Sequence, residues 1–368
     1  MNQVKAFLQR KDIIFSGKRY GIDALGAMAQ GLFCTLLVGT ILNTIGQQFG
    51  IEFLQRILVT VGKGEGAVSY TLGGLASAMV GPGIAIAIGI ALHSPQMVLF
   101  SLIPVGFAAN AMGGAGGPLS VYFVTIVAAE AGKLVSKETK IDLLVTPSVT
   151  ILAGIGFASL VAAPIGAAAH AVGAAIMWAT ELQPFFMGIL VSALMGIALT
   201  LPISSAAICA AFGLTGLAGG AAVAGCCAQM VGFAVMSFRE NGWGGLVAQG
   251  VGTSMLQMPN IVKNPRIWIP PTLASMITGP LATCLFRLEM NGAPVSSGMG
   301  TCGFVGQIGV YTGWVSEMAA GTRSAVSAMD WAGLVLISFV LPAVLSWIFC
   351  EVMRRRNWIG ENDLKLDL

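Results

Sequence analysis

Apolar runs of membrane-spanning length alternate with short polar stretches along almost the whole chain. The first run is Ile22–Ile45 and the last is Trp331–Val352. The runs between them cover residues 66–92, 96–109, 119–131, 143–163, 165–178, 185–198, 203–212, 216–238 and 268–288. About 20 apolar residues are enough for one helix to cross a bilayer core. The pattern predicts an all-α polytopic membrane protein with about eight to ten transmembrane helices, some of them broken or re-entrant.

One apolar stretch, from Thr272 to Trp314, breaks where a lipid-facing helix would continue. Arg287 and Glu289 interrupt it, and small or polar residues follow as far as Gly300. Irregular backbone at membrane depth is tolerated only where protein or a water-filled cavity satisfies it, and an ionisable side chain there indicates function. We expect Glu289 to face an internal polar cavity and to contact a ligand. The alternative is a structural ion pair with Arg287, although residues two apart in a helix do not face each other.

The sequence also contains an echo of this stretch. LASAMVGP at Leu75–Pro82 resembles LASMITGP at Leu273–Pro280, and a glycine-rich break follows the first copy at Asn110–Pro118. Broken segments in corresponding positions of two halves indicate a transporter-like site between repeats. We therefore predict two repeated halves, about 17–180 and 183–353. The alternative is that such short motifs recur by chance in membrane sequences.

The candidate substrate-binding residues all lie either at one of the two breaks or at the end of a span. They are Glu289, Asn291, Asn110, His93, Ser296, Thr301 and Gln307. Asn and Ser beside Gly and Pro also serve as ordinary turn residues that cap their own backbone, so this alternative stays open. A lone histidine, here His93 or His170, is more often a packed residue than a proton relay. We expect solvated or interfacial roles for Glu130, Glu317 and Asp330.

Composition and charge narrow the class of protein. Of the 368 residues, 56% are hydrophobic and 10% are charged, which excludes a soluble enzyme. Lys and Arg concentrate at residues 5–19 and 354–356, so both ends are expected in the cytoplasm. The predicted organisation is an N-terminal segment 1–16, a membrane domain 17–353 and a tail 354–368. The stretch Gly242–Arg266 is too polar for a lipid-facing span and is predicted to be re-entrant or amphipathic.

Several kinds of chemistry have no signature in the sequence. The seven cysteines form no CxxC pair and are expected to be small buried hydrophobes. No phosphate loop, zinc pattern or nucleophile elbow is present, so we predict no cofactor, no metal site and no intrinsic catalytic centre. The net charge is +3, and the basic residues lie in loops and tails, so the charge gives no indication of nucleic-acid binding. The charged start of the chain does not resemble a removable signal peptide.

Two stretches carry a family resemblance: PNIVKNPRIWIPPTLASMITGP and NGAPVSSGMGTCGFVGQIGVYTGW. They resemble the membrane-embedded IIC component of bacterial phosphotransferase-system sugar permeases, and more narrowly a stand-alone branch that includes perfringolysin-regulator-type membrane proteins. The resemblance covers about Gly17 to Met353. It implies a homodimeric permease of the bacterial cytoplasmic membrane that binds a sugar, which a IIB partner then phosphorylates. An acidic residue and a histidine hold the sugar in such proteins, which implies these roles for Glu289 and His93.

The chain departs from the family pattern in two respects. We expect no fused IIA or IIB domain, and no glycine-isoleucine-proline or glutamate-proline signature occurs near Glu289. Two hypotheses therefore remain. The first is a permease for a small polar solute such as a sugar, with or without phosphorylation, and at most the membrane subunit of a sugar phosphotransferase. The second is a membrane-embedded sensor or regulator that kept the fold without phosphotransfer.

Overall fold

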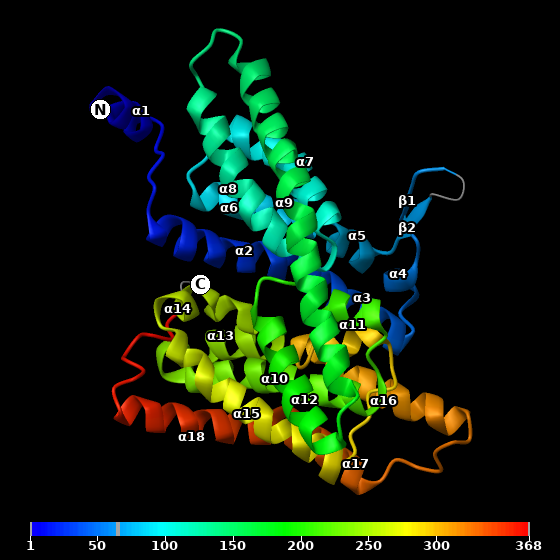
Figure 1. Cartoon of the computed structure of the whole chain (residues 1–368). Coiled ribbons are helices and arrows are strands. Elements are labelled where there is room, and N and C mark those ends of the chain that lie inside the picture. Colours follow the sequence, from blue (N-terminus) through cyan, green and yellow to red (C-terminus); the bar gives the residue numbers. More distant parts are fainter. Residues whose placement is uncertain (1, 64–66, 367–368) are drawn as a thin grey trace. The chain divides into compact units, whose positions relative to one another are not determined.

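The computed structural model describes residues 2–63 and 67–366 of the chain. These residues form two compact units, Met1–Ala168 and Ala169–Leu368 (Figure 1). Gly66, with which the second apolar run was expected to begin, lies outside the described residues, as do residues 1, 367 and 368 of the expected terminal segments. The structural similarity of two halves stays a prediction.

Unit 1 is helical, with one short antiparallel hairpin in which Val59 pairs with Tyr70. Its elements are α1 (Asn2–Arg10), η1 (Arg19–Asp23), α2 (Ala24–Leu32), η2 (Phe33–Leu37), α3 (Val38–Phe49), α4 (Glu52–Gln55), β1 (Val59–Val61), β2 (Val68–Tyr70), α5 (Leu72–Ala78), α6 (Val80–Ala91), α7 (Gln96–Gly113), η4 (Gly114–Gly116) and α8 (Gly117–Val135). The long helix α9 (Asp142–Thr180) begins in this unit and ends in the next.

Unit 2 is also helical, and π- and 3₁₀-helical turns interrupt it more often than unit 1. Its elements are α10 (Pro184–Thr200), α11 (Ser205–Phe212), α12 (Gly216–Met236), α13 (Phe238–Val247), η5 (Ala248–Gly252), η6 (Ser254–Gln257), α14 (Met258–Lys263), η7 (Pro265–Trp268), α15 (Ile269–Pro280), η8 (Leu281–Leu285), η9 (Pro294–Gly298), η10 (Cys302–Phe304), α16 (Val305–Ala319), α17 (Ala328–Val335), η11 (Leu336–Val340) and α18 (Leu341–Arg355). The prediction of an all-α polytopic membrane protein is confirmed.

Five helices of the described residues are long and apolar enough to span a membrane: Arg19–Phe49, Gln96–Val135, Asp142–Thr180, Gly216–Met236 and Ala328–Arg355. The pair α5 and α6, bent by 51° at its break, brings the number to six if it is one span. The sequence led us to expect eight to ten. It divided the 39-residue helix α9 in two, and it counted the interrupted α15–η8 stretch and the 17-residue α10 as full spans.

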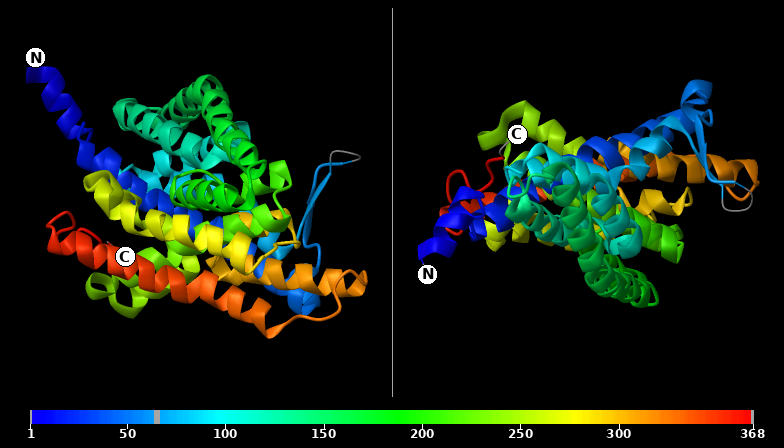
Figure 2. Two further views of the ribbon diagram at one scale, coloured as in Figure 1. Left: turned by 60° about the horizontal axis from the view of Figure 1, so that its bottom comes forward. Right: turned by 90° about the horizontal axis from the view of Figure 1, so that it is seen from above.

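The core of unit 2 is organised around α12. This helix packs against α10, α15 and α18, and 94% of its most apolar window is buried. α15 and α18 pack against each other, and the left view of Figure 2 shows them running alongside one another. The α12 side chains Val223, Ala224 and Cys227 join a buried apolar cluster that includes Trp314 of α16. Small side chains on α12 let several neighbouring backbones approach it closely.

A glycine-to-glycine helix contact occurs in each unit at the echoed Gly-Pro pair. In unit 1, a Cβ on Gly81 of α6 would overlap the carbonyl oxygen of Gly106 of α7. In unit 2, a Cβ on Gly279 of α15 would overlap the carbonyl oxygen of Gly188 of α10. Both glycines therefore mark helix crossings at which only a hydrogen fits.

An ion-pair cluster fixes residues 10–20 to the rest of unit 1. Arg19 donates to both carboxylate oxygens of Asp12, at 3.0 and 2.6 Å, and to the carbonyl oxygen of Leu92. Lys133 of α8 is 1% exposed, and its ammonium donates to the same Leu92 carbonyl and to the Asp12 carbonyl at 3.1 and 3.0 Å. Its charge is balanced by Glu130 at 2.9 Å. The hydrogen bond from Arg19 lowers the pKa of Asp12 to about 2.

We expect Gly279→Ala to destabilise the protein by about 1–3 kcal/mol, because the new methyl group forces α15 away from α10. Thermal unfolding in detergent, followed by loss of monodisperse protein, measures the effect. Gly156→Ala is the matched control, since a Cβ at Gly156 of α9 has no atom within 4 Å. Equal thermal stabilities for the two variants would show that the crossing is not tightly packed.

The Asp12 pair makes stability depend on pH in acid. The pKa of Asp12 is depressed, so its contribution is complete above the ordinary value of 3.8 and is lost as pH falls toward about 2. The protein should therefore lose more thermal stability between pH 4 and pH 2 than the Asp12→Asn variant loses. If thermal stability fell equally with pH in both proteins between pH 4 and pH 2, the ion pair between Asp12 and Arg19 would be contradicted.

Candidate functional site

The expected break after α15 is present in the structure. The helix α15 widens into the π-helix η8, which ends at Leu285, and Arg287 then adopts a positive φ of 46°. Residues 287–293 form no helix, and η9 and η10 then lead into α16. The sequence causes the break here, because charged and glycine-rich residues replace the apolar ones and Pro294 has no amide hydrogen to donate.

The non-helical backbone of this break is satisfied by protein on two sides. Met290 and Gly216 exchange both main-chain hydrogen bonds at 2.9 Å, and the Leu288 amide donates to the Ala282 carbonyl at 2.8 Å. A Cβ on Gly220 of α12 would overlap the Leu288 carbonyl oxygen, and one on Gly313 of α16 would lie 2.9 Å from the Asn291 amide nitrogen. The break is thus held between α12 and α16, and glycines make this close approach possible.

Asn291 joins two carboxylates that are distant in sequence. Its amide nitrogen Nδ2 donates to Glu289 Oε2 at 3.1 Å and to Glu317 Oε1 of α16 at 2.5 Å. The side chains of Glu289 and Asn291 are exposed. Both bonds use hydrogens of the Asn291 amide group. Glu289 Oε1 and Asn291 Oδ1 have no hydrogen-bond partner among the described residues. These two oxygens are acceptors that a ligand can use.

A second ion-pair group continues from Glu317. Arg323 lies 3.1 Å from Glu317 and 2.6 Å from Asp330, and its guanidinium lies 5.4 Å from the centre of the Trp314 ring. Burial lowers the pKa of Arg323, but its hydrogen bonds to Asp330 and Glu317 outweigh this and raise it. With Glu289, the group holds three carboxylates and one guanidinium, and it therefore carries net negative charge. A hydroxylated or cationic solute suits such a surface better than an anion does.

Aromatic rings lie beside the Arg323 group. Trp331 of α17 packs against Trp314 at 5.3 Å in an edge-on arrangement and against Tyr311 of α16 at 5.9 Å. Trp314 is buried, whereas Tyr311 and Trp331 are each nearly half exposed. Rings of this kind supply apolar faces next to hydrogen-bonding groups, a combination that ligand sites commonly use.

The alternative reading of Glu289 as the partner of Arg287 gains no support. No ion pair joins the two side chains in the described part of the chain, and Asn291 is the residue that contacts Glu289. Sequence reasoning placed Glu317 and Asp330 at solvated span ends and did not connect them with the break. A carboxylate inside an apolar helix, followed six residues later by an arginine, is the signal that would have indicated Glu317.

Three other predicted residues of unit 2, Ser296, Thr301 and Gln307, and their neighbour Ser297 are buried around the same break. Ser297 donates to the Leu214 carbonyl at 2.7 Å, Thr301 contacts Met230 Sδ at 3.5 Å, and Gln307 Nε2 contacts Cys227 Sγ at 3.2 Å. Ser296 packs against Gly309. Contacts with distant parts of unit 2, and not with their own local backbone, therefore occupy Ser297 and Thr301. Gln307 Oε1 is buried without a hydrogen-bond partner.

The remaining predicted residues, Asn110 and His93, belong to unit 1. Asn110 is half buried in α7. Its Oδ1 lies only 2.5 Å from the position that a Cβ on Gly117 would take. His93 has a positive φ of 54° and an exposed ring, and its Nδ1 lies 3.1 Å from Asp12 Oδ2. His93 is thus part of the ion-pair cluster at the end of α6. His170 packs against Phe212, with 4.9 Å between the ring centres.

The whole chain, and not only the site, was compared with known proteins. Searches of curated proteins and of solved structures found no match. A family model described as "Phosphotransferase system, EIIC" matches residues 22–366. The match covers both units, including the break and the residues around Asn291. The chain therefore belongs to the phosphotransferase system EIIC family, and it is a multi-pass membrane permease component of that system.

Proposed function

We propose that this chain binds a small polar solute, a sugar or a sugar-like molecule, and moves it across the membrane by alternating access. Glu289 and Asn291 are the residues that bind it directly. The bacterial cytoplasmic membrane is the proposed location. A separate IIB protein that phosphorylates the solute at the cytoplasmic face is the proposed partner, and this chain supplies no catalytic group of its own.

One observation carries the proposal: Glu289 and Asn291, joined by a hydrogen bond, each keep an acceptor oxygen without a partner among the described residues, on an irregular segment held between α12 and α16. Sugar hydroxyls are donors, and a hydrogen bond to a charged carboxylate is stronger than one to a neutral group. The exposed rings of Tyr311 and Trp331 offer apolar surface near Glu317 and Arg323. A solute with hydroxyl groups on an apolar carbon ring matches both features.

Further parts of the proposal concern the rest of the chain. We propose that Asn110 and His93 contribute to solute binding from the first repeat, and that Ser296, Thr301 and Gln307 shape the break. The paired glycine crossings at Gly81 and Gly279 support two repeated halves. Small-residue helix faces support a homodimer, which the family resemblance also implies.

Replacing Glu289 by Gln keeps the shape of the side chain and removes its charge. We expect apparent affinity for the solute to fall about 10- to 100-fold, as the loss of a charged hydrogen bond of about 1.5–3 kcal/mol implies. Uptake of labelled sugars into proteoliposomes, with and without a IIB protein, measures this. Glu181→Gln is the matched control, because Glu181 is an exposed residue after α9 with no side-chain partner among the described residues.

Unchanged affinity in Glu289→Gln would remove Glu289 from the site. If the parent protein bound a sugar but moved none under either condition, the alternative function would apply, namely a membrane-embedded sensor or regulator with the same fold.

The two lysine- and arginine-rich segments should both face the cytoplasm. Cysteines introduced by Lys5→Cys and by Arg356→Cys should resist a membrane-impermeant maleimide in intact cells and react after permeabilisation. Reaction of either position in intact cells would reverse the proposed orientation of that end.

A further inference from the structure

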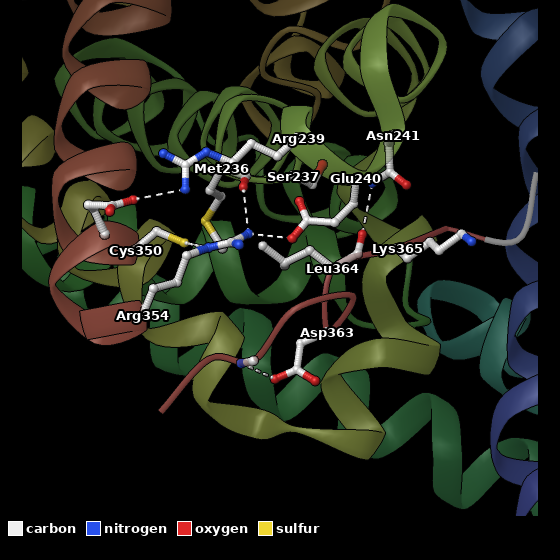
Figure 3. Close-up of polar contacts among 12 residues, drawn as sticks. Met236, Ser237, Arg239, Glu240, Asn241, Cys350, Arg354, Asp363, Leu364 and Lys365 are labelled. Carbon is white, nitrogen blue, oxygen red and sulfur yellow. Dashed lines mark hydrogen bonds and ion pairs between the residues drawn. The ribbon is translucent and has the colours of Figure 1, made fainter. Parts of the chain in front are cut away.

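The segment Trp358–Leu366 returns along unit 2 after the last helix, α18. A turn at Asn357, with φ of 55°, reverses the chain, and the segment then lies against α13 and α14 (Figure 3). In Figure 3, Asn241 of α13 points toward the main chain at Leu364. Neither the family match nor the proposed solute site accounts for these contacts.

Side-chain amides hold this segment by its backbone. Asn241 Nδ2 donates to the Leu364 carbonyl, and Asn241 Oδ1 accepts from the Leu366 amide, both at 2.8 Å. This is the pair of bonds that a neighbouring β-strand would make. Gln257 donates to the same Leu364 carbonyl at 3.0 Å, and Asn260 donates to the Lys365 carbonyl at 2.8 Å. Asn241, Gln257 and Asn260 therefore contact main-chain groups of the segment and none of its polar side chains.

Apolar side chains of the segment fill the space between these bonds. Leu364 is 0% exposed, Ile359 is 3% exposed and Leu366 is 9% exposed, whereas Lys365 and Asn362 point to the outside. Near the turn, Asn264 donates to the Trp358 carbonyl at 3.0 Å and to Asp363 Oδ2 at 2.7 Å. The segment is thus seated along its length, with Leu364 as its most buried side chain.

The amides that hold the segment also hold one another. Gln257 donates to Gln249 at 2.8 Å, Asn260 donates to Gln257 at 2.9 Å, and Gln249 donates to Ser237 at 2.8 Å. All four side chains are buried. Removing the segment would leave amide hydrogens of this network without their acceptors, which is costly in a buried place.

The network lies in the part of the chain that was expected to be re-entrant. Residues 242–268 contain no helix longer than a few turns: Gly242 has non-helical angles, and π and 3₁₀ turns follow at η5, η6 and η7. Short irregular elements of this kind gain little stability from their own hydrogen bonds. Their arrangement depends on side-chain contacts, and the returning segment supplies a large share of them.

An ion pair anchors the base of the segment. Arg354 near the end of α18 lies 2.5 Å from Glu240 and donates to the Met236 carbonyl at 3.3 Å (Figure 3). It joins α18 to the end of α12 and the start of α13. The segment beyond it is therefore tethered next to the amides that it contacts.

We propose that Asn241, Gln257 and Asn260 form a site that reads the main chain of Leu364–Leu366, and that the turn-containing segment Trp358–Leu366 is its resident ligand. The segment acts as a releasable latch that holds residues 242–268 in one arrangement. Seating it orders the irregular region, and its release lets that region move while the core around α12 stays folded. A tethered ligand is favoured over a free peptide by its high effective concentration.

Hydrogen–deuterium exchange of the full chain in detergent tests the latch. Asn241→Asp removes the donor to the Leu364 carbonyl and places a charge against it. We expect exchange in residues 248–263 to accelerate about tenfold or more, in keeping with the loss of main-chain hydrogen bonds, while α10 and α12 exchange as before. Asn362→Asp makes the same chemical change on an exposed residue of the segment and should leave exchange unchanged.

A neighbouring pair of variants tests main-chain reading without altering the amides. Leu364→Ala should loosen the latch, whereas Lys365→Ala should not, because only the carbonyl of Lys365 is used. A synthetic peptide of residues 358–366, WIGENDLKL, added to the Leu364→Ala protein should restore slow exchange in residues 248–263. The same peptide with proline in the position of Leu366 lacks the amide hydrogen that Asn241 accepts and should fail.

Three results would overturn the proposal. The first is unchanged exchange in both Asn241→Asp and Leu364→Ala. The second is acceleration that spreads equally through α10 and α12, which would make the segment part of one cooperative fold. The third is equal action of the two peptides, which would remove main-chain reading from the account.

Discussion

Backbone polar groups that leave regular helix inside a membrane protein must find partners within the protein. Unit 2 meets this constraint at two irregular stretches with two different devices. At residues 286–304, glycines of α12 and α16 bring helices close enough for a main-chain pairing between Met290 and Gly216. At residues 242–268, amide side chains replace the missing main-chain partners. The buried helix α12 packs against elements around both stretches, so the arrangement of unit 2 depends on it.

The candidate site follows from the first device. Gly216 of α12 and Ala282 of η8 satisfy backbone groups of the break, and α16 packs against it, so its exposed side chains are not needed to hold it. Asn291 uses its two hydrogens to position Glu289 and Glu317, and the oxygens that remain are free to accept hydrogen bonds. The same segment therefore combines a fixed backbone with available acceptors, which is what selective binding of a hydroxylated solute requires.

The sequence indicated the fold class and the position of the break, because apolar runs and their interruption by Arg287 and Glu289 are local features. It did not indicate Glu317 or Arg323 as neighbours of the break, since their contact with Asn291 arises from the path of α16. The sequence divided residues 142–180 into two runs, whereas the prolines at 147 and 164 sit inside the continuous helix α9. The sequence predicted residues 354–368 only as a tail, since the amide side chains that hold the returning segment are more than 100 residues away in the chain.

The central claim is that the break between α12 and α16 binds a sugar-like solute through Glu289 and Asn291. An experimental structure of the full protein, determined with a sugar that it binds, tests this claim most directly. The account predicts ligand density within hydrogen-bond distance of Glu289 Oε1 and Asn291 Oδ1. Density for the sugar elsewhere, with both oxygens facing lipid or bulk water, would contradict it.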